Sequence, residues 1–194
     1  MWHGLCLGGE FFAALVAIDR DIVERVARGG CPECGGPLHR SDYDRKPRGG
    51  LIAEAGEEFN RRFSLCCGWC RVRAQPPSVR FLGRRVYLEV VVLVAAMWAL
   101  SGAAGATGVP VRTIRRWQGW WTSIFPSLAT WRDLRARFPP PPPDDASMPR
   151  SFLQRLAEDL GPHDIKTVIV NAARLLAPVT TQSCPAASRF LLVE

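Results

Sequence analysis

Apolar residues recur every three or four positions in several parts of the chain, which is the spacing of a helix with one buried face. The first such pattern runs from Glu10 to Arg28 and stops at Gly29-Gly30. Its apolar positions on one predicted face are Phe11, Leu15, Ile18, Ile22 and Val26. We therefore expect the N-terminal segment, residues 1–30, to be built on one core helix.

Near the C-terminus the same spacing predicts two short helices, from Phe152 to Leu160 and from His163 to Leu176. Five prolines at 139–143 precede them, and such a run cannot lie inside a helix or a central strand. Residues 139–149 are thus predicted to be a stiff linker, and residues 150–194 a weakly structured helical tail.

The apolar run from Val86 to Leu100 is the one candidate for a membrane span. Glu89 interrupts it, and the eleven residues that follow are too few for a span of about 20. We expect a buried helix here and no membrane partner.

Positive charge is concentrated in the middle of the chain. The net charge is +7, yet residues 61–132 carry eleven Lys and Arg against a single Glu. With 47% apolar residues the chain can bury a core, so disorder does not explain this block. A basic block that is also rich in glycine, tryptophan and β-branched residues indicates a polyanionic partner.

Two short patterns, CPECGG at 31–36 and CCGWCR at 66–71, contain Cys-x-x-Cys pairs. Each such turn directs two thiolates from one loop, and two turns supply the four tetrahedral ligands that zinc prefers. The predicted Zn²⁺ ligands are Cys31, Cys34, Cys67 and Cys70. No secretion signal is visible, so we expect a reducing cytoplasm, where thiols bind metal rather than pair.

Two neighbouring side chains leave the ligand set open. Cys66 also has a tolerable spacing to Cys70, and His39 could replace one thiolate. The segment CGWC at 67–70 is a rival in its own right, because it looks like the dithiol of thioredoxin-like enzymes. In those enzymes the motif opens a helix, whereas strand or loop residues follow it here.

The stretch LSGAAGATGVPVRTIRRWQGWW, from Leu100 to Trp121, has the pattern of a helix-turn-helix. A small residue, Ala104, would let two helices cross, and Gly108 would take the turn. Pro110 suits the first turn of the second helix.

In that second helix Ile114, Trp117 and Trp121 share one face and should be buried. The side chains left outside are types that read base edges or grip phosphates. They are Arg112, Thr113, Arg115, Arg116 and Gln118.

Arginines before the helix-turn-helix are expected to hold the DNA backbone. They are Arg61, Arg62, Arg71, Arg73, Arg80, Arg84 and Arg85. Residues 40–60 read as an elaborated loop whose Arg45, Lys46 and Arg48 are further candidates, and alternation from Arg61 to Leu65 predicts a short strand.

Together these patterns predict a mainly α protein with a small β zinc ribbon. The ribbon would take residues 31–85, and the helix-turn-helix domain residues 86–138.

The order of the features resembles the amino-terminal half of bacterial insertion-sequence transposases, and the stand-alone transposon-associated proteins similar to it. The resemblance covers about residues 31 to 125: a CPxCGG knuckle, a basic strand entering a second CxxC knuckle, and a helix-turn-helix ending in TIRRWQGWW. It implies zinc on the four cysteines named above and DNA contact through Arg112, Thr113, Arg115 and Arg116.

Two departures from that family matter. The loop between the knuckles is longer than in a minimal ribbon, and only 73 residues follow Trp121. Transposases of this kind continue into a ribonuclease-H-like domain whose carboxylates bind two metal ions, and these 73 residues cannot build it. We therefore expect no enzyme.

The sequence favours a sequence-specific, zinc-dependent binder of double-stranded DNA in the cytoplasm, at the bacterial nucleoid. It would be a transposase remnant, an accessory factor at transposon ends or a regulator. A transposase is its candidate protein partner, and no oligomeric state is predicted. The alternative is a zinc-ribbon module that docks a protein.

Overall fold

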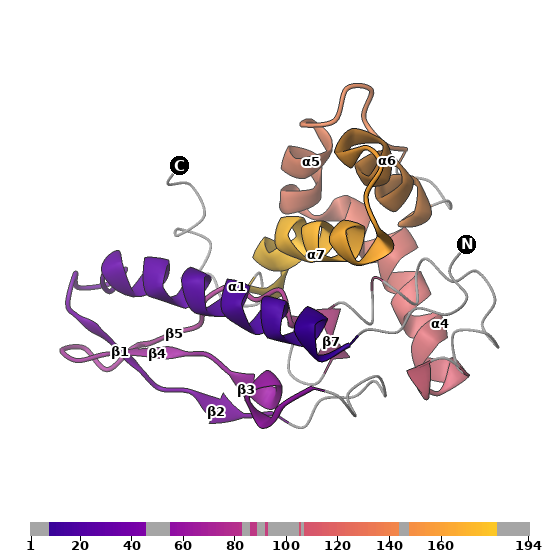
Figure 1. The fold of residues 1–194 in the computed structure, drawn as a ribbon. Coiled ribbons are helices and arrows are strands. Elements are labelled where there is room, and N and C mark those ends of the chain that lie inside the picture. The colour runs from indigo at the N-terminus through magenta and orange to yellow at the C-terminus, as the bar shows by residue number, and fades with distance from the viewer. Residues whose placement is uncertain are drawn as a thin grey trace. The chain divides into compact units, whose positions relative to one another are not determined.

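The computed structural model of the chain describes residues 8–45, 55–82, 86–88, 92, 105, 107–143 and 148–181. Within these residues lie five α-helices and three small antiparallel sheets (Figure 1). The chain divides into two compact units. Of the described residues, the sheet unit takes those from 8 to 87 and from 176 onward, and the helical unit those from 88 to 175.

The sheet unit combines one long helix with short strands. Its elements are α1 (Gly9–Arg28), β1 (Leu38–Arg40), β2 (Tyr43–Asp44), the 3-10 turn η2 (Glu57–Asn60), β3 (Arg61–Arg62), β4 (Leu65–Cys67), β5 (Arg73–Ala74), β6 (Phe81–Leu82), β7 (Val86–Tyr87) and the 3-10 turn η5 (Ala177–Thr181). The strands pair antiparallel in the orders β1-β4-β5, β2-β3 and β6-β7. The strand predicted from Arg61 to Leu65 is therefore split between β3 and β4.

Helix α1 confirms the N-terminal prediction and buries one polar residue that the apolar pattern missed. Leu15 and Val23 are buried as an amphipathic helix requires, but Asp19 between them is also fully buried. Its carboxylate accepts hydrogen bonds from the Ser78 hydroxyl, the Val79 amide at 2.7 Å and Nε of Arg80 at 2.8 Å. These bonds satisfy a buried charge and fix segment 78–80 to α1.

Stacked aromatic rings fill the core of the sheet unit. Phe12 meets Phe59 with ring centroids 4.9 Å apart, and Phe59 meets Tyr87 at 4.8 Å. Phe81 stacks on Tyr87 across the β6-β7 pair at 5.6 Å. The core therefore joins α1, η2 and the last two strands without help from the cysteines.

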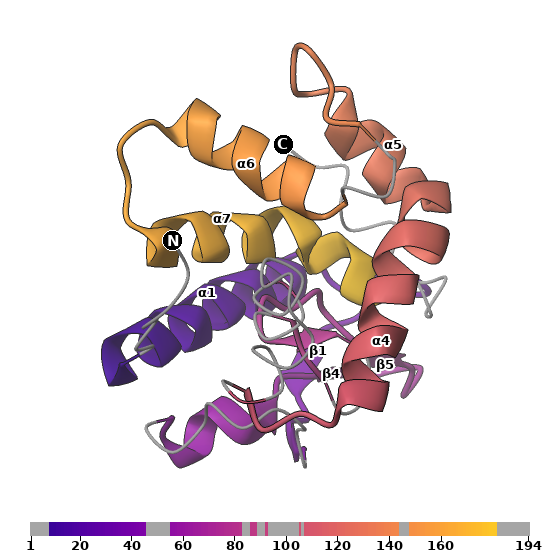
Figure 2. The ribbon, with the colours of Figure 1, turned by 90° about the vertical axis from the view of Figure 1, so that its right-hand side faces the viewer.

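The helical unit contains the two C-terminal helices that were predicted from periodicity. Its elements are α4 (Val111–Gly119), the π-helical turn η3 (Trp120–Ile124), the 3-10 turn η4 (Phe125–Ser127), α5 (Ala129–Arg135), α6 (Arg150–Leu160) and α7 (Ile165–Leu176), whose last residue belongs to the sheet unit. Helices α6 and α7 lie beside each other (Figures 1 and 2). Trp131 of α5 contacts Phe125 at 4.9 Å and Phe152 of α6 at 5.6 Å, so the segment after the prolines packs on the helices before them.

The start of the apolar run was assigned wrongly from the sequence. Val86 and Tyr87 form β7, which pairs with β6, and do not begin a helix. Most of the run up to Leu100 lies outside the described residues, as does Ala104. No helix among the described residues is long and apolar enough to cross a membrane.

Candidate metal centre

The first cysteine turn follows directly from the end of α1. Gly30 takes a φ of +73°, which turns the chain away from the helix axis into Cys31. The Cys31 amide donates to the Gly36 carbonyl at 2.9 Å, and the Gly35 amide donates to the Cys31 carbonyl at 2.8 Å. Gly35, at a φ of +71°, closes this loop in a conformation that favours glycine.

The second turn links β4 to β5. The Cys67 amide donates to the Val72 carbonyl at 2.9 Å, and the Gly68 amide donates to the Pro37 carbonyl at 2.9 Å, which ties one knuckle to the other. Arg71 occupies the turn with a φ of +62°, a conformation that non-glycine residues rarely adopt. Both turns are thus held by their own backbone bonds.

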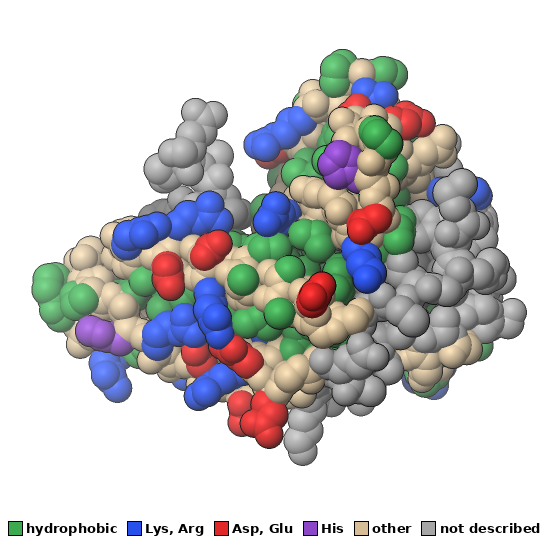
Figure 3. Space-filling model, in the orientation of Figure 1, with side chains coloured by type: hydrophobic (Ala, Val, Ile, Leu, Met, Phe, Trp, Pro, Cys, Tyr) green, Lys and Arg blue, Asp and Glu red, His purple; other side chains and the backbone are tan. Residues whose placement is uncertain are grey.

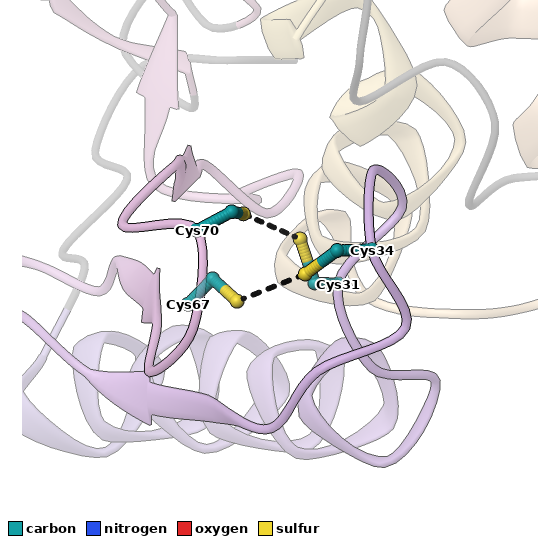
Figure 4. A group of neighbouring side chains, drawn as sticks. All are labelled: Cys31, Cys34, Cys67 and Cys70. Atoms are coloured by element: carbon teal, nitrogen blue, oxygen red, sulfur yellow. Dashed lines mark hydrogen bonds between the residues drawn. The ribbon is translucent and has the colours of Figure 1, made fainter.

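The structure brings together the four cysteines that the sequence selected. Sulfur atoms of Cys31 and Cys70 lie 3.5 Å apart, as do those of Cys34 and Cys67, and all four lie within 4.8 Å of one another (Figure 4). Four thiolates around a tetrahedral zinc, with Zn–S of about 2.3 Å, would have sulfurs about 3.8 Å apart. The donor set and its spacing therefore fit a thiophilic divalent cation.

The four thiols also influence one another's protonation. Burial raises the pKa of the Cys67 thiol, but the backbone groups of Cys70 and Trp69 and the neighbouring thiols outweigh it and lower that pKa to about 6. At Cys70 the backbone of Val72 lowers the pKa, whereas burial and the other three thiols raise it to about 12. Cys67 is thus the thiol that loses its proton most readily. The other thiols can become thiolates only if a bound cation compensates the added negative charge.

The rings of Trp69 and His39 lie against glycines of the two cysteine turns, residues 31–36 and 67–72. A Cβ on Gly36 would lie 2.8 Å from the indole ring of Trp69, and one on Gly68 would lie 2.9 Å from Nε2 of His39. The Trp69 amide also approaches the Cys67 sulfur at 3.4 Å. Trp69 is nevertheless 70% exposed. Its exposure could not be predicted, because a loop of two residues between cysteines is too short to show an apolar period.

The two alternative ligands lie apart from the sulfur cluster. Cys66 and His39 are paired across β4 and β1, and Cys66 Sγ faces the carbonyl of Arg71 at 3.6 Å. Neither belongs to the group of ligand atoms that could share a metal. Residues 67–70 join two strands and open no helix, unlike the dithiol motif of thioredoxin-like enzymes.

Helix α4 arranges its side chains as the sequence predicted. Ile114 is fully buried, Trp117 and Trp121 are nearly so, and Gly108 makes the preceding turn at a φ of +63°. The predicted contact residues lie on the other faces: Arg112, Arg115 and Arg116 are exposed, and Thr113 and Gln118 half-buried. Among the described residues no carboxylate pairs with these three arginines.

The arginines assigned to phosphate contact divide into three groups. Arg62 and Arg80 are 3% and 0% exposed, so the prediction that they grip a nucleic-acid backbone at the surface was wrong. They are buried because they interact with other parts of the sheet unit, which the local sequence does not reveal. Arg61, Arg71 and Arg73 are exposed. Arg84 and Arg85 lie outside the described residues.

The two units differ in net charge. The described residues of the helical unit carry ten Lys and Arg against four Asp and Glu, whereas those of the sheet unit carry ten against nine. Acidic and basic side chains are interspersed over α1 and the strands on the face drawn in Figure 3. The excess positive charge of the described residues therefore belongs to the helical unit.

Comparisons with protein-family models, with curated proteins and with solved structures find no match to this chain.

Proposed function

We propose that this protein is a sequence-specific, zinc-dependent binder of double-stranded DNA. Zinc would be held by Cys31, Cys34, Cys67 and Cys70, where it orders the two knuckles and performs no chemistry. Helix α4 would enter the major groove, as in a helix-turn-helix. The protein would act at the bacterial nucleoid without a catalytic domain, as a transposon-associated factor, regulator or transposase remnant.

The observation that carries the proposal is the face of α4. Arg112, Arg115 and Arg116 are exposed and have no acidic partner among the described residues, on a helix whose opposite face is anchored by Ile114 and Trp117. A helix that is anchored on one face and presents arginines without a described carboxylate partner on the other has the donors that recognise guanine edges and phosphates. The positive excess of its unit adds attraction to any duplex.

The first experiment is a selection from random duplex DNA with zinc-loaded protein at physiological salt. We expect one motif to be enriched, and the enrichment to weaken when the metal is chelated, because the exposed Arg71 and Arg73 beside the second cysteine turn then lose their fixed positions. Salt-sensitive retention without a motif would contradict sequence-specific binding.

Single substitutions then test the role of α4 on the selected motif. Arg115→Ala should weaken binding to the motif by about 5- to 150-fold, the equivalent of roughly 1–3 kcal/mol, and should affect random DNA less. Arg132→Ala is the matched control, because Arg132 is an exposed arginine of the same unit on α5. Equal losses for both variants on both kinds of DNA would show that α4 does not read bases.

A second candidate function, docking of a protein partner, is favoured by Trp69. A tryptophan held against Gly36 and 70% exposed is the type of side chain that dominates binding energy at interfaces. In that case Trp69→Ala would abolish association with the partner and leave DNA retention unchanged. If Trp69→Ala and Arg115→Ala were compared, DNA binding should respond only to Arg115→Ala under our first proposal.

A further inference from the structure

Two buried arginines of the sheet unit differ in how far their charge is compensated. Arg80 donates to Asp19 and to the carbonyls of Glu58, Phe59 and Arg61, at distances between 2.8 and 3.0 Å. Every nitrogen of its guanidinium group therefore has an acceptor, and one acceptor is a carboxylate. The sheet unit thus provides hydrogen-bond acceptors for the whole guanidinium group of one buried arginine.

Arg62 is almost as deeply buried, at 3% exposure, but lacks such partners. Its Nη2 donates to the Pro76 carbonyl at 2.5 Å, while Nη1 has no hydrogen-bond partner among the described residues. Burial lowers the pKa of Arg62 to about 10, and the charges of Arg80 and Arg45 act in the same direction, against the attraction of Asp19 and Tyr43. A buried cation without a carboxylate partner is costly to the fold.

Two more arginines gather around Tyr43, the residue opposite Arg62 in the β2-β3 pair. The guanidinium carbon of Arg45 lies 4.4 Å from the centre of the Tyr43 ring, and that of Arg73 lies 5.6 Å from it. The Tyr43 hydroxyl accepts hydrogen bonds from Arg45 and Gln75. Within the part of the chain that the structure describes, Nε of Arg45 has no hydrogen-bond partner.

The acidic residues of the neighbouring strands do not balance this cluster. Asp42 accepts from Arg40 and from the Ser64 amide, and Asp19 is occupied by Arg80. Asp44 is exposed and faces Arg61 across the β2-β3 pair. Among the described residues, no carboxylate forms an ion pair with the three arginines around Tyr43.

We propose that Arg45 and Arg73 around Tyr43, next to the buried charge of Arg62, form a binding site for a phosphate group of a nucleic-acid backbone. Exposed Arg73 and half-buried Arg45 would donate to the phosphate oxygens, and Arg62, buried opposite Tyr43, would add its charge without touching the phosphate. A phosphate has several acceptor oxygens and suits guanidinium donors that converge from different directions. The inference rests on the proposed DNA-binding function and adds a backbone contact in the sheet unit.

The test is the salt dependence of DNA affinity for variants of the accessible arginines. Arg45→Gln and Arg73→Gln should each weaken motif and random DNA alike, and should each reduce the slope of log K against log salt by about 1. Arg25→Gln is the matched control: Arg25 is an exposed arginine of α1 in the same unit, and we expect its variant to keep the full slope. Bound zinc is measured in every variant to show that the knuckles are intact.

An unchanged slope in both Arg45→Gln and Arg73→Gln would overturn this inference. The proposed function is tested separately by the effect of Arg115→Ala on binding to the motif. If the wild-type protein binds no DNA, the proposed function fails and a second measurement decides about the site. Thermal unfolding is then followed with added pyrophosphate. Protection of the wild type that is lost in Arg73→Gln would support a phosphate site, and absence of protection would exclude it.

Discussion

At the scale of single residues, Asp19 and Arg80 make the most consequential contact of the sheet unit. Both side chains are fully buried, and Asp19→Asn would leave the Arg80 charge without its carboxylate. We expect this change to lower the free energy of unfolding by about 3–5 kcal/mol, as when one partner of a buried ion pair is removed. Denaturant unfolding of the zinc-loaded protein measures the loss.

The exposed pair of Arg20 and Glu58 is the natural control for that experiment. Both of its side chains are about half exposed, and Glu58→Gln should cost less than about 1 kcal/mol. If Asp19→Asn were as mild as Glu58→Gln, the buried pair would contribute no more than a surface one.

The sequence could not foresee this pair. Apolar spacing selected Ile18 and Ile22 for the buried face of α1, yet both are only half-buried while Asp19 is fully buried. The reason lies 61 positions away, at Arg80, and periodicity carries no information about so distant a partner. The cysteines were predictable, because a Cys-x-x-Cys turn places two sulfurs together by local geometry alone.

At the scale of elements, the turn before α4 and the last residue of α4 each contain a glycine, and these two glycines allow a matched pair of substitutions. A Cβ would meet nothing within 4 Å at Gly108 or at Gly119, so only backbone conformation distinguishes them. Gly108→Ala forces a φ of +63° on alanine and should cost about 1–2 kcal/mol. Gly119, with φ of −60° and ψ of −35°, is helical, and Gly119→Ala should gain about 0.5–1 kcal/mol.

Thermal unfolding of the two variants provides the check. Opposite shifts are expected, with Gly108→Ala melting below the wild type and Gly119→Ala above it. A melting temperature of Gly108→Ala at or above that of the wild type would mean that the turn before α4 does not need its left-handed glycine, and a drop for Gly119→Ala would contradict only the gain expected there.

Helices of nine residues or more were largely predictable, and the short strands were not. Helices α1, α4, α6 and α7 each repeat an apolar face over two or more turns, so the period is visible in the sequence. Strands of two or three residues, such as β2 and β7, are too short to show an alternating pattern. Their pairing depends on partners in other segments, as Tyr43 opposite Arg62 illustrates.

At the scale of the whole molecule, charge along the chain was a poor guide to charge in space. The basic block of residues 61–132 supplies exposed arginines to both units, but two of its members, Arg62 and Arg80, are buried. The remaining imbalance of the described residues falls on the helical unit. Under the proposed function, attraction to a duplex should therefore come mainly from the helical unit, and the sheet unit should add a local contact.

Removal of the metal should change amide exchange in those segments whose structure depends on the metal and leave the other segments unchanged. The knuckles are held by a few backbone bonds, and four thiols converge there, so chelation should expose the amides of residues 31–36 and 67–72 to exchange. The aromatic core around Phe59 and Tyr87 uses no cysteine and should keep its protection, as should α4 and α6.

Hydrogen exchange of the zinc-loaded and chelated protein distinguishes these outcomes segment by segment. The matched variant is Cys34→Ser, which removes one ligand of the cluster, with Cys66→Ser as the control outside it. Cys34→Ser should reproduce the effect of chelation on the knuckles, and Cys66→Ser should bind zinc as the wild type does. Loss of protection throughout the sheet unit would mean that the metal supports the aromatic core as well. Unchanged exchange at the knuckles would mean that the four cysteines need no metal to hold their shape.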